Sequence, residues 1–332
     1  MCLEKTKTKL KSRYETWRNK NRFNVGFSDL FLEMIPDGHP YKTTPWGISE
    51  QIDTLSLSTC QTHYSTYFSP NNAVLVVVGD LVPADATTLI YQYFSPLIAS
   101  NNIPIDPVLS LNEIPSKIFE KNIDFPQEPL YFNFTGLNFY LPSARNDDVI
   151  ILEHIADILE RDSSRPGNIF KKYTKNRRLM LRSQIWTTTR LGYSMFHFAG
   201  MNLFRDGSIH KIRKNILKTF KDIGENGIDE KLLSNQKKHN LLERYQDGYD
   251  YNWLAWQLGI SEIVYGDYTV YTRKIDILNN LTNEEIKRVV KKYLHSGNLV
   301  SYSLTANKKT WATPIVSFLA NQIVFRFVDI MH

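Results

Sequence analysis

The chain contains the stretch Tyr67-Phe68-Ser69-Pro70-Asn71-Asn72-Ala73-Val74-Leu75-Val76-Val77-Val78-Gly79-Asp80, which decides the fold. Its apolar run, Ala73 to Val78, ends at Gly79-Asp80 and predicts a buried β-strand. Upstream, residues 55–68 place apolar side chains at helical spacing, and Ser56 stands where it can cap that helix. The region therefore predicts a helix, a tight turn and a buried strand, in that order.

The same pattern returns 226 residues later, without a gap. Residues 281–294 again have helical spacing, and the turn at 295–298 leads into an apolar segment that begins at Leu299. Thr282 and Glu285 form the Thr-x-x-Glu pattern of a capping box. Identical residues stand at 55 and 281 (Leu), 67 and 293 (Tyr), 72 and 298 (Asn), and 74 and 300 (Val). Such a repeat indicates two copies of one structural unit.

The sequence between the repeated blocks alternates helical and strand patterns. Residues 146–160 and 232–244 have helical spacing, and residues 186–199 read as a β-hairpin. Apolar residues from Ile209 to Ile223 mark one face of a long helix, which we expect Gly224 to close. The mixture predicts an α+β fold.

The repeat also predicts a domain organisation. The helix at 146–160 belongs to the second copy, and its counterpart would lie 226 positions upstream, before Met1. We therefore expect an incomplete first domain. The predicted parts are residues 1–100 (the C-terminal part of a first domain), 101–115 (a linker), 116–309 (a second domain) and 310–332 (an apolar tail).

The composition is that of an ordinary globular protein, with 42% hydrophobic and 22% charged residues in 332. The two cysteines are too few for a disulfide framework, and no Cys-x-x-Cys spacing suggests zinc. Residues 1–22 show no signal-peptide pattern, and residues 314–328 are too short and too polar for a transmembrane segment. The compartment stays open.

The net charge of +6 is unevenly spread. Basic residues gather in two clusters: Lys5, Lys7, Lys9, Lys11, Arg13, Arg18, Lys20 and Arg22, and Lys171, Lys172, Lys175, Arg177, Arg178 and Arg182. A solvated helical face is the favoured interpretation, and an anionic surface as partner is the alternative. Because the chain has no nucleic-acid-binding motif, we expect no nucleic acid.

Several blocks carry a resemblance to a known family. The blocks His39-Pro40-Tyr41, Pro45-Trp46-Gly47 and Ile52-Asp53-Thr54-Leu55, the stretch 67–80, and the regions 158–182 and 280–304 are similar to the pitrilysin/insulinase family of zinc metallopeptidases. The resemblance implies two homologous α+β domains, each a mainly antiparallel sheet covered by helices. These domains would face each other across a chamber that binds peptide or unfolded polypeptide.

The family's chemistry needs His-x-x-Glu-His on one helix and a further Glu, which together hold zinc and activate water. None of the eight histidines stands in such a motif; they are His39, His63, His154, His197, His210, His239, His295 and His332. Lys9 aligns with the further Glu, and Glu4 is the nearest alternative. A lysine cannot replace a carboxylate at zinc. We therefore assign no catalytic or metal residue, and no cofactor to this chain, whereas the resembled family uses zinc.

Other candidate positions carry no site either. Thr174 and Leu181 stand where second copies in the family often hold an Arg and a Tyr that bind the substrate backbone, so substrate-binding residues stay unassigned. His154 lies near Glu153 and Asp157 on one predicted helix, but Ile158 stands at the i+4 position where a second ligand is needed. His63 lies on an apolar helix face, which predicts a core histidine.

Three functions follow as hypotheses. The first is a truncated or non-catalytic member of the family that forms part of a peptide-binding chamber or supports a catalytic partner subunit. The second is an active zinc endopeptidase whose metal-binding N-terminal segment is missing from this chain. The third is a binding protein that uses its basic surface.

Overall fold

The computed structural model describes residues 2–20, 29, 32–35, 37, 42–43, 49–104, 117–123, 132–163, 182–190, 194–203 and 208–306. The chain divides into two compact units. Unit 1 comprises residues 1–107 and 242–273, and unit 2 comprises residues 108–241 and 274–332. The predicted tail at 310–332, Thr174 and Leu181 lie outside the described residues. The predicted domain boundaries stay a prediction.

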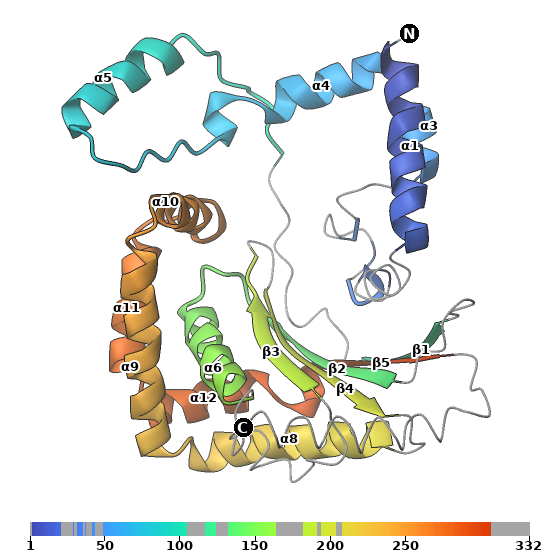
Figure 1. The fold of residues 1–332 in the computed structure, drawn as a ribbon, viewed down its shortest axis with the longest axis vertical. Helices are drawn as coiled ribbons and strands as arrows, with labels where there is room; N and C mark the ends of the chain where they lie inside the picture. The colour runs from blue at the N-terminus through green and yellow to red at the C-terminus, as the bar shows by residue number, and fades with distance from the viewer. Residues whose placement is uncertain are drawn as a thin grey trace. The chain divides into compact units, whose positions relative to one another are not determined.

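Unit 2 is built around a five-stranded sheet with the order β1-β5-β2-β4-β3 (Figure 1). Its strands are β1 (Lys117–Ile123), β2 (Phe132–Leu141), β3 (Arg182–Thr188), β4 (Ser194–Leu203) and β5 (Leu299–Ala306). β1 runs parallel to β5, and every other neighbouring pair is antiparallel. The predicted hairpin is confirmed as β3 and β4. β5, the strand of the second repeated block, is central because it pairs with β1 and β2.

Three helices supply the apolar layer over this sheet: α6 (Asp147–Ser163), α8 (Ser208–Asn226) and α12 (Asn283–Tyr293) (Figure 1). The rings of Phe139, Phe196 and Phe220 meet edge to face, with centroids 5.4 to 6.5 Å apart, and join β2, β4 and α8. Such contacts stabilise beyond the burial of their area. The core of the described fold lies between this sheet and these helices.

Local sequence signals explain how the helices begin and end. Thr282 and Glu285 form the predicted capping box, in which each residue binds the other's backbone N–H. The expectation that Gly224 closes α8 is wrong, because the helix continues to Asn226. Gly227 follows with φ of 74°, a left-handed conformation that glycine adopts without strain.

Unit 1 is helical in its described parts. It contains α1 (Cys2–Lys20), α3 (Ser49–Thr54), α4 (Leu57–Tyr67), the 3₁₀ turn η1 (Pro70–Asn72), α5 (Pro83–Phe94), α10 (Tyr251–Ile260) and the π-helical turn η3 (Ser261–Tyr265). α9 (Glu230–Asp247) and α11 (Val270–Asn280) contribute residues to both units. None of the helices in the described ranges is long and apolar enough to cross a membrane.

The predicted buried strand at residues 73–78 is not found. The segment is extended but forms no ladder, and Val74, Leu75 and Val77 are exposed. A strand is defined by its partners, and none of the described strands pairs with this segment. The α+β class and the helix-covered, mainly antiparallel sheet are confirmed, whereas the second copy of that sheet stays a prediction.

Candidate binding face of the sheet

The sheet has a second face, opposite to its helical layer, that carries polar groups. Asn138 on β2 pairs in register with His197 on β4, which pairs in turn with Trp186 on β3. Val300 on β5 pairs with Asn138, and both Asn138 and His197 are buried. Cross-strand neighbours share a face, so these residues form one row across four strands.

His197 is the centre of this row. Its Nδ1 lies 2.7 Å from Asn138 Oδ1, and its Nε2 lies 2.8 Å from the Thr188 hydroxyl. Because an amide oxygen only accepts, Nδ1 carries the proton and Nε2 accepts from the hydroxyl. Burial, aided by the charge of Arg190, lowers the pKa of His197 to about 3. The imidazole is therefore neutral, and it holds β2, β3 and β4 together rather than moving protons.

Strand β3 forms one edge of the described sheet. An edge strand presents backbone groups that can pair with another chain. Here the Ile185 N–H is already used, since it donates to the Glu160 carboxylate of α6 at 2.5 Å. A side chain of the covering helix thus occupies part of the strand edge.

A charged cluster joins the start of α6 to α12. The Asp148 carboxylate accepts from Arg288 at 2.7 Å, Lys292 at 2.9 Å and the Tyr293 hydroxyl at 2.8 Å. Burial alone would raise the pKa of this carboxyl, but the three donors outweigh it and lower the pKa from 3.8 to about 2. The three donors all belong to α12, so the cluster links the start of α6 to that helix.

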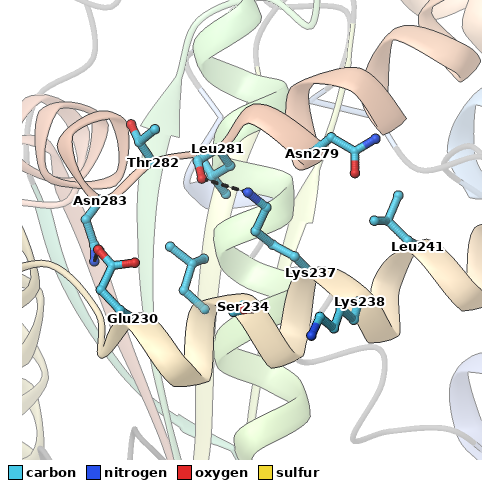
Figure 2. A pocket seen from close by; sticks show the side chains of 10 residues that line it. Glu230, Ser234, Lys237, Lys238, Leu241, Asn279, Leu281, Thr282 and Asn283 are labelled. Carbon is cyan, nitrogen blue, oxygen red and sulfur yellow. Dashed lines mark hydrogen bonds between the residues drawn. The ribbon is translucent and has the colours of Figure 1, made fainter.

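A hollow of about 380 Å³ lies between α9 and the start of α12. Figure 2 shows the side chains that line it. Lys237 Nζ donates to the Leu281 carbonyl at 3.1 Å. The Asn283 amide donates to the Ile228 carbonyl and to Glu230, both at 2.7 Å, and accepts from the Ile228 N–H. These polar groups hydrogen-bond to one another, so they connect α9 to the start of α12.

The side chains of the described residues do not fit a zinc ion. Across the described ranges, no group of three or more His, Cys, Asp or Glu side chains is placed to hold a metal. His154 is buried with Nε2 2.9 Å from the Lys274 carbonyl, and its neighbour Glu153 pairs with the Lys274 ammonium at 2.7 Å. Both nitrogens of His197 are hydrogen-bonded within the sheet. His39 and His332 lie outside the described residues.

The two positions compared with the family's further zinc ligand, Lys9 and Glu4, lie in α1. Lys9 is exposed there, and Glu4 pairs with Lys7 at 2.9 Å. Among the basic residues of this helix, Lys11 binds Asp53 and Arg18 binds Asp29. Part of the N-terminal basic cluster is thus neutralised inside unit 1, which weakens the case for an anionic partner.

Residues 54–240, more than half of the chain, match the family described as the peptidase M16 inactive domain. The chain belongs to this family. The match confirms the resemblance to the pitrilysin/insulinase zinc metallopeptidases that the repeated blocks carry. The matched part of this M16 chain runs from the end of α3 into α9 and includes Asn138, Trp186, His197 and the strands β1 to β4.

The M16 chain is similar to several known proteins. It is 24% identical over 126 residues to the zinc protease PqqE of Helicobacter pylori, a match that covers 38% of this chain and only 28% of that protein. The fold is similar to that of a protease from Helicobacter pylori, with a TM-score of 0.77 and 17% identity over 91% of this chain and 72% of that one. It also resembles the periplasmic protease PqqL of Escherichia coli, with a TM-score of 0.64 and 14% identity over 92% of this chain and 33% of that one.

Sequence reasoning missed the polar row, the charged cluster at Asp148 and the contact between Glu160 and β3. The signal for Asp148 was its place in an acidic first helical turn. Its partners lie more than a hundred residues away, so spacing could not reveal them. His63 was expected in a core, but it is exposed, and its ring lies at a tilt against the ring of Tyr67 with centroids 4.6 Å apart.

Proposed function

We propose that this chain is a non-catalytic half of a two-part M16 peptidase, which forms part of a peptide-binding chamber and supports a catalytic partner. The observation that carries the proposal is the match of residues 54–240 to the peptidase M16 inactive domain. The chain covers only 33% of the protease PqqL, which supports a further domain as its partner.

The internal repeat supports the same architecture. Two copies of one helix–turn–strand block favour two homologous domains, the arrangement in which M16 halves would face one another. Because the described side chains do not fit zinc, we assign no hydrolytic step to this half.

The strand edge of β3 is where we place peptide contact. An extended peptide adds to a sheet edge through backbone hydrogen bonds, and its side chains then lie on alternate faces. A peptide carbonyl bound at the Ile185 N–H would replace the Glu160 carboxylate, which accepts there now. Glu160 therefore competes with peptide in this proposal.

Fluorescence anisotropy of a dye-labelled, unfolded casein peptide tests it. Glu160→Ala should tighten peptide binding by up to about tenfold, since a charge-assisted hydrogen bond of about 1.5 kcal/mol no longer competes. Asp157→Ala, an exposed change on the same helix, is the control and should leave binding unchanged.

Glu160→Gln keeps an acceptor without the charge, so it should give a smaller gain if the alanine variant does not fold. Absence of peptide binding by the wild-type chain, or a gain in the Asp157→Ala control equal to that in Glu160→Ala, would reject peptide contact at this edge.

A further inference from the structure

Helix α8 buries one side in unit 2 and presents the other to solvent. The helix packs on α12 and β2 (Figure 1). Its side chains in the core are Ile212, Ile216, Phe220 and Ile223. Its opposite side carries four exposed lysines, Lys211, Lys214, Lys218 and Lys221. From the helical repeat, these four lie within an arc of about 80° and along about 15 Å of the axis. We call them the lysine stripe.

The lysine stripe is only partly neutralised by its surroundings. No acidic residue stands between Ser208 and Lys221, and the stripe lies outside both basic clusters of the sequence. Within the described residues, Lys221 is the only member with an ion pair, which it forms with Glu225 at 3.8 Å. Lys291 of α12 is also exposed and lies beside α8, since a Cβ placed on Gly224 would be 3.0 Å from its Cγ. The region is therefore strongly positive.

The order of charges along α8 opposes the helix dipole. Acidic side chains stabilise the N-terminus of a helix, and basic side chains stabilise its C-terminus. In the same unit, α6 and α12 each begin with two acidic residues, and α12 ends with two lysines. α8 instead has no acidic residue in its first turn and no basic residue in its last.

The spacing of the stripe adds a second cost. Its lysines follow one another at three, four and three positions, and like charges at such spacing repel on a helix. A face that served only to keep α8 solvated and stable would mix both signs of charge. Departures from local rules are expected where residues serve binding, so the stripe indicates a binding surface.

The side chains around the stripe decide the class of partner. A positive surface attracts an anionic partner. A protein interface needs an apolar centre, but none of the side chains described as exposed on α8 is apolar. Single-stranded nucleic acid stacks its bases on aromatic side chains, and α8 exposes no Phe, Tyr or Trp in its described part. An anionic bilayer needs neither, because its surface attracts lysines through charge alone.

We propose that the lysine stripe of α8 binds the headgroup layer of an anionic phospholipid bilayer. The contact is peripheral: the ammonium groups lie among the lipid phosphates, and the apolar side of α8 stays in the core of unit 2. Lysine is a point charge on a flexible stem, so the stripe fits a fluid headgroup layer better than one fixed phosphate. This binding depends neither on peptide contact at β3 nor on a catalytic partner.

Co-sedimentation of the full 332-residue chain with vesicles tests the proposal. One set of vesicles is phosphatidylcholine, and the other contains about one third phosphatidylglycerol. The chain should sediment with the anionic vesicles only, and high salt should release it by screening. The triple variant Lys211→Gln, Lys214→Gln and Lys218→Gln should lower the partition coefficient about a hundredfold, at roughly fivefold for each lysine.

The control is a second triple variant, Lys5→Gln, Lys9→Gln and Arg13→Gln in α1. These three residues are also exposed along one helix, so the control removes the same net charge. It should leave binding to the anionic vesicles nearly unchanged. Equal losses in the two variants would assign the binding to net charge and overturn the role of the stripe.

Other outcomes also overturn the proposal. They are no binding by the wild-type chain, equal binding to both sets of vesicles, and tighter binding to duplex DNA or to polyglutamate than to the anionic vesicles. Release from the vesicles by millimolar inorganic phosphate at constant ionic strength would show a discrete phosphate site instead.

Thermal unfolding separates binding from folding. Because the charges of the stripe repel one another and oppose the helix dipole, the α8 triple variant should unfold about 2 to 4 °C above the wild-type chain. Loss of vesicle binding with a midpoint at or above that of the wild type supports a surface kept for binding. A lower midpoint would show that the lysines support the fold, and would overturn the proposal.

Discussion

Asp148→Asn is expected to remove a pH-dependent part of the stability of unit 2. In the folded chain, Arg288, Lys292 and Tyr293 hold the pKa of Asp148 at about 2, against 3.8 ordinarily. A carboxyl whose folded pKa is depressed stabilises the fold above the unfolded pKa. That contribution is lost as the pH falls from about 4 toward 2.

The size of the effect follows from the structure. A shift of nearly two pH units corresponds to about 2.5 kcal/mol at 1.36 kcal/mol per unit. The Arg288 and Lys292 side chains are 50% and 54% exposed, so solvent screens part of this, and we expect about 2 kcal/mol. Asp147→Asn is the matched control, because Asp147 lies in the same first turn of α6 and shares its helix-terminal position.

The assay is urea unfolding followed by circular dichroism at pH 7, 5, 4 and 3. The wild-type chain should be more stable than Asp148→Asn by about 2 kcal/mol at pH 7, and the difference should shrink below pH 4. Asp147→Asn should cost less than about 1 kcal/mol. A difference that is independent of pH, or equal losses in the two variants, would refute the role given to the three donors.

Three further changes probe the sheet. Gly136→Ala should lower the free energy of unfolding in urea by about 3 kcal/mol, because the new Cβ would lie 2.0 Å from the Tyr302 ring. Gly259→Ala is the control, since its Cβ has room, and it should be neutral or slightly stabilising. Equal effects of the two changes would contradict the close packing at Gly136. Asn138→Ala should cost about 1 to 3 kcal/mol by removing the acceptor of the buried His197 N–H, and a neutral result would show that the bond is not needed. His197→Gln should flatten the fall in stability between pH 6.5 and 3, because the wild-type imidazole takes up a proton only on unfolding; an unchanged slope would assign it to other groups.

Features set by neighbouring residues could be predicted from the sequence. The capping box at Thr282, the helix α6 and the hairpin of β3 and β4 depend on spacing within about twenty residues, and the structure confirms them. The helix and turn of the first repeated block were also predicted, because caps and turn residues act locally.

What depends on distant partners could not be predicted. Residues 73–78 carry a strong strand pattern, but pairing and burial require other strands. His63 shows the same limit, since an apolar helix face becomes a core only when something covers it. The row at His197 depends on the register of β2, β3 and β4. A shift of one residue in any of these strands would move its side chains to the other face of the sheet.

The proposed function requires that this M16 chain does not cut peptides by itself. A quenched fluorogenic peptide incubated with the full chain and excess Zn²⁺ tests it most directly, with and without a chelator. The account predicts a rate equal to the protein-free blank in both conditions. Hydrolysis that rises with chain concentration and disappears with chelator would contradict it and favour an active zinc endopeptidase.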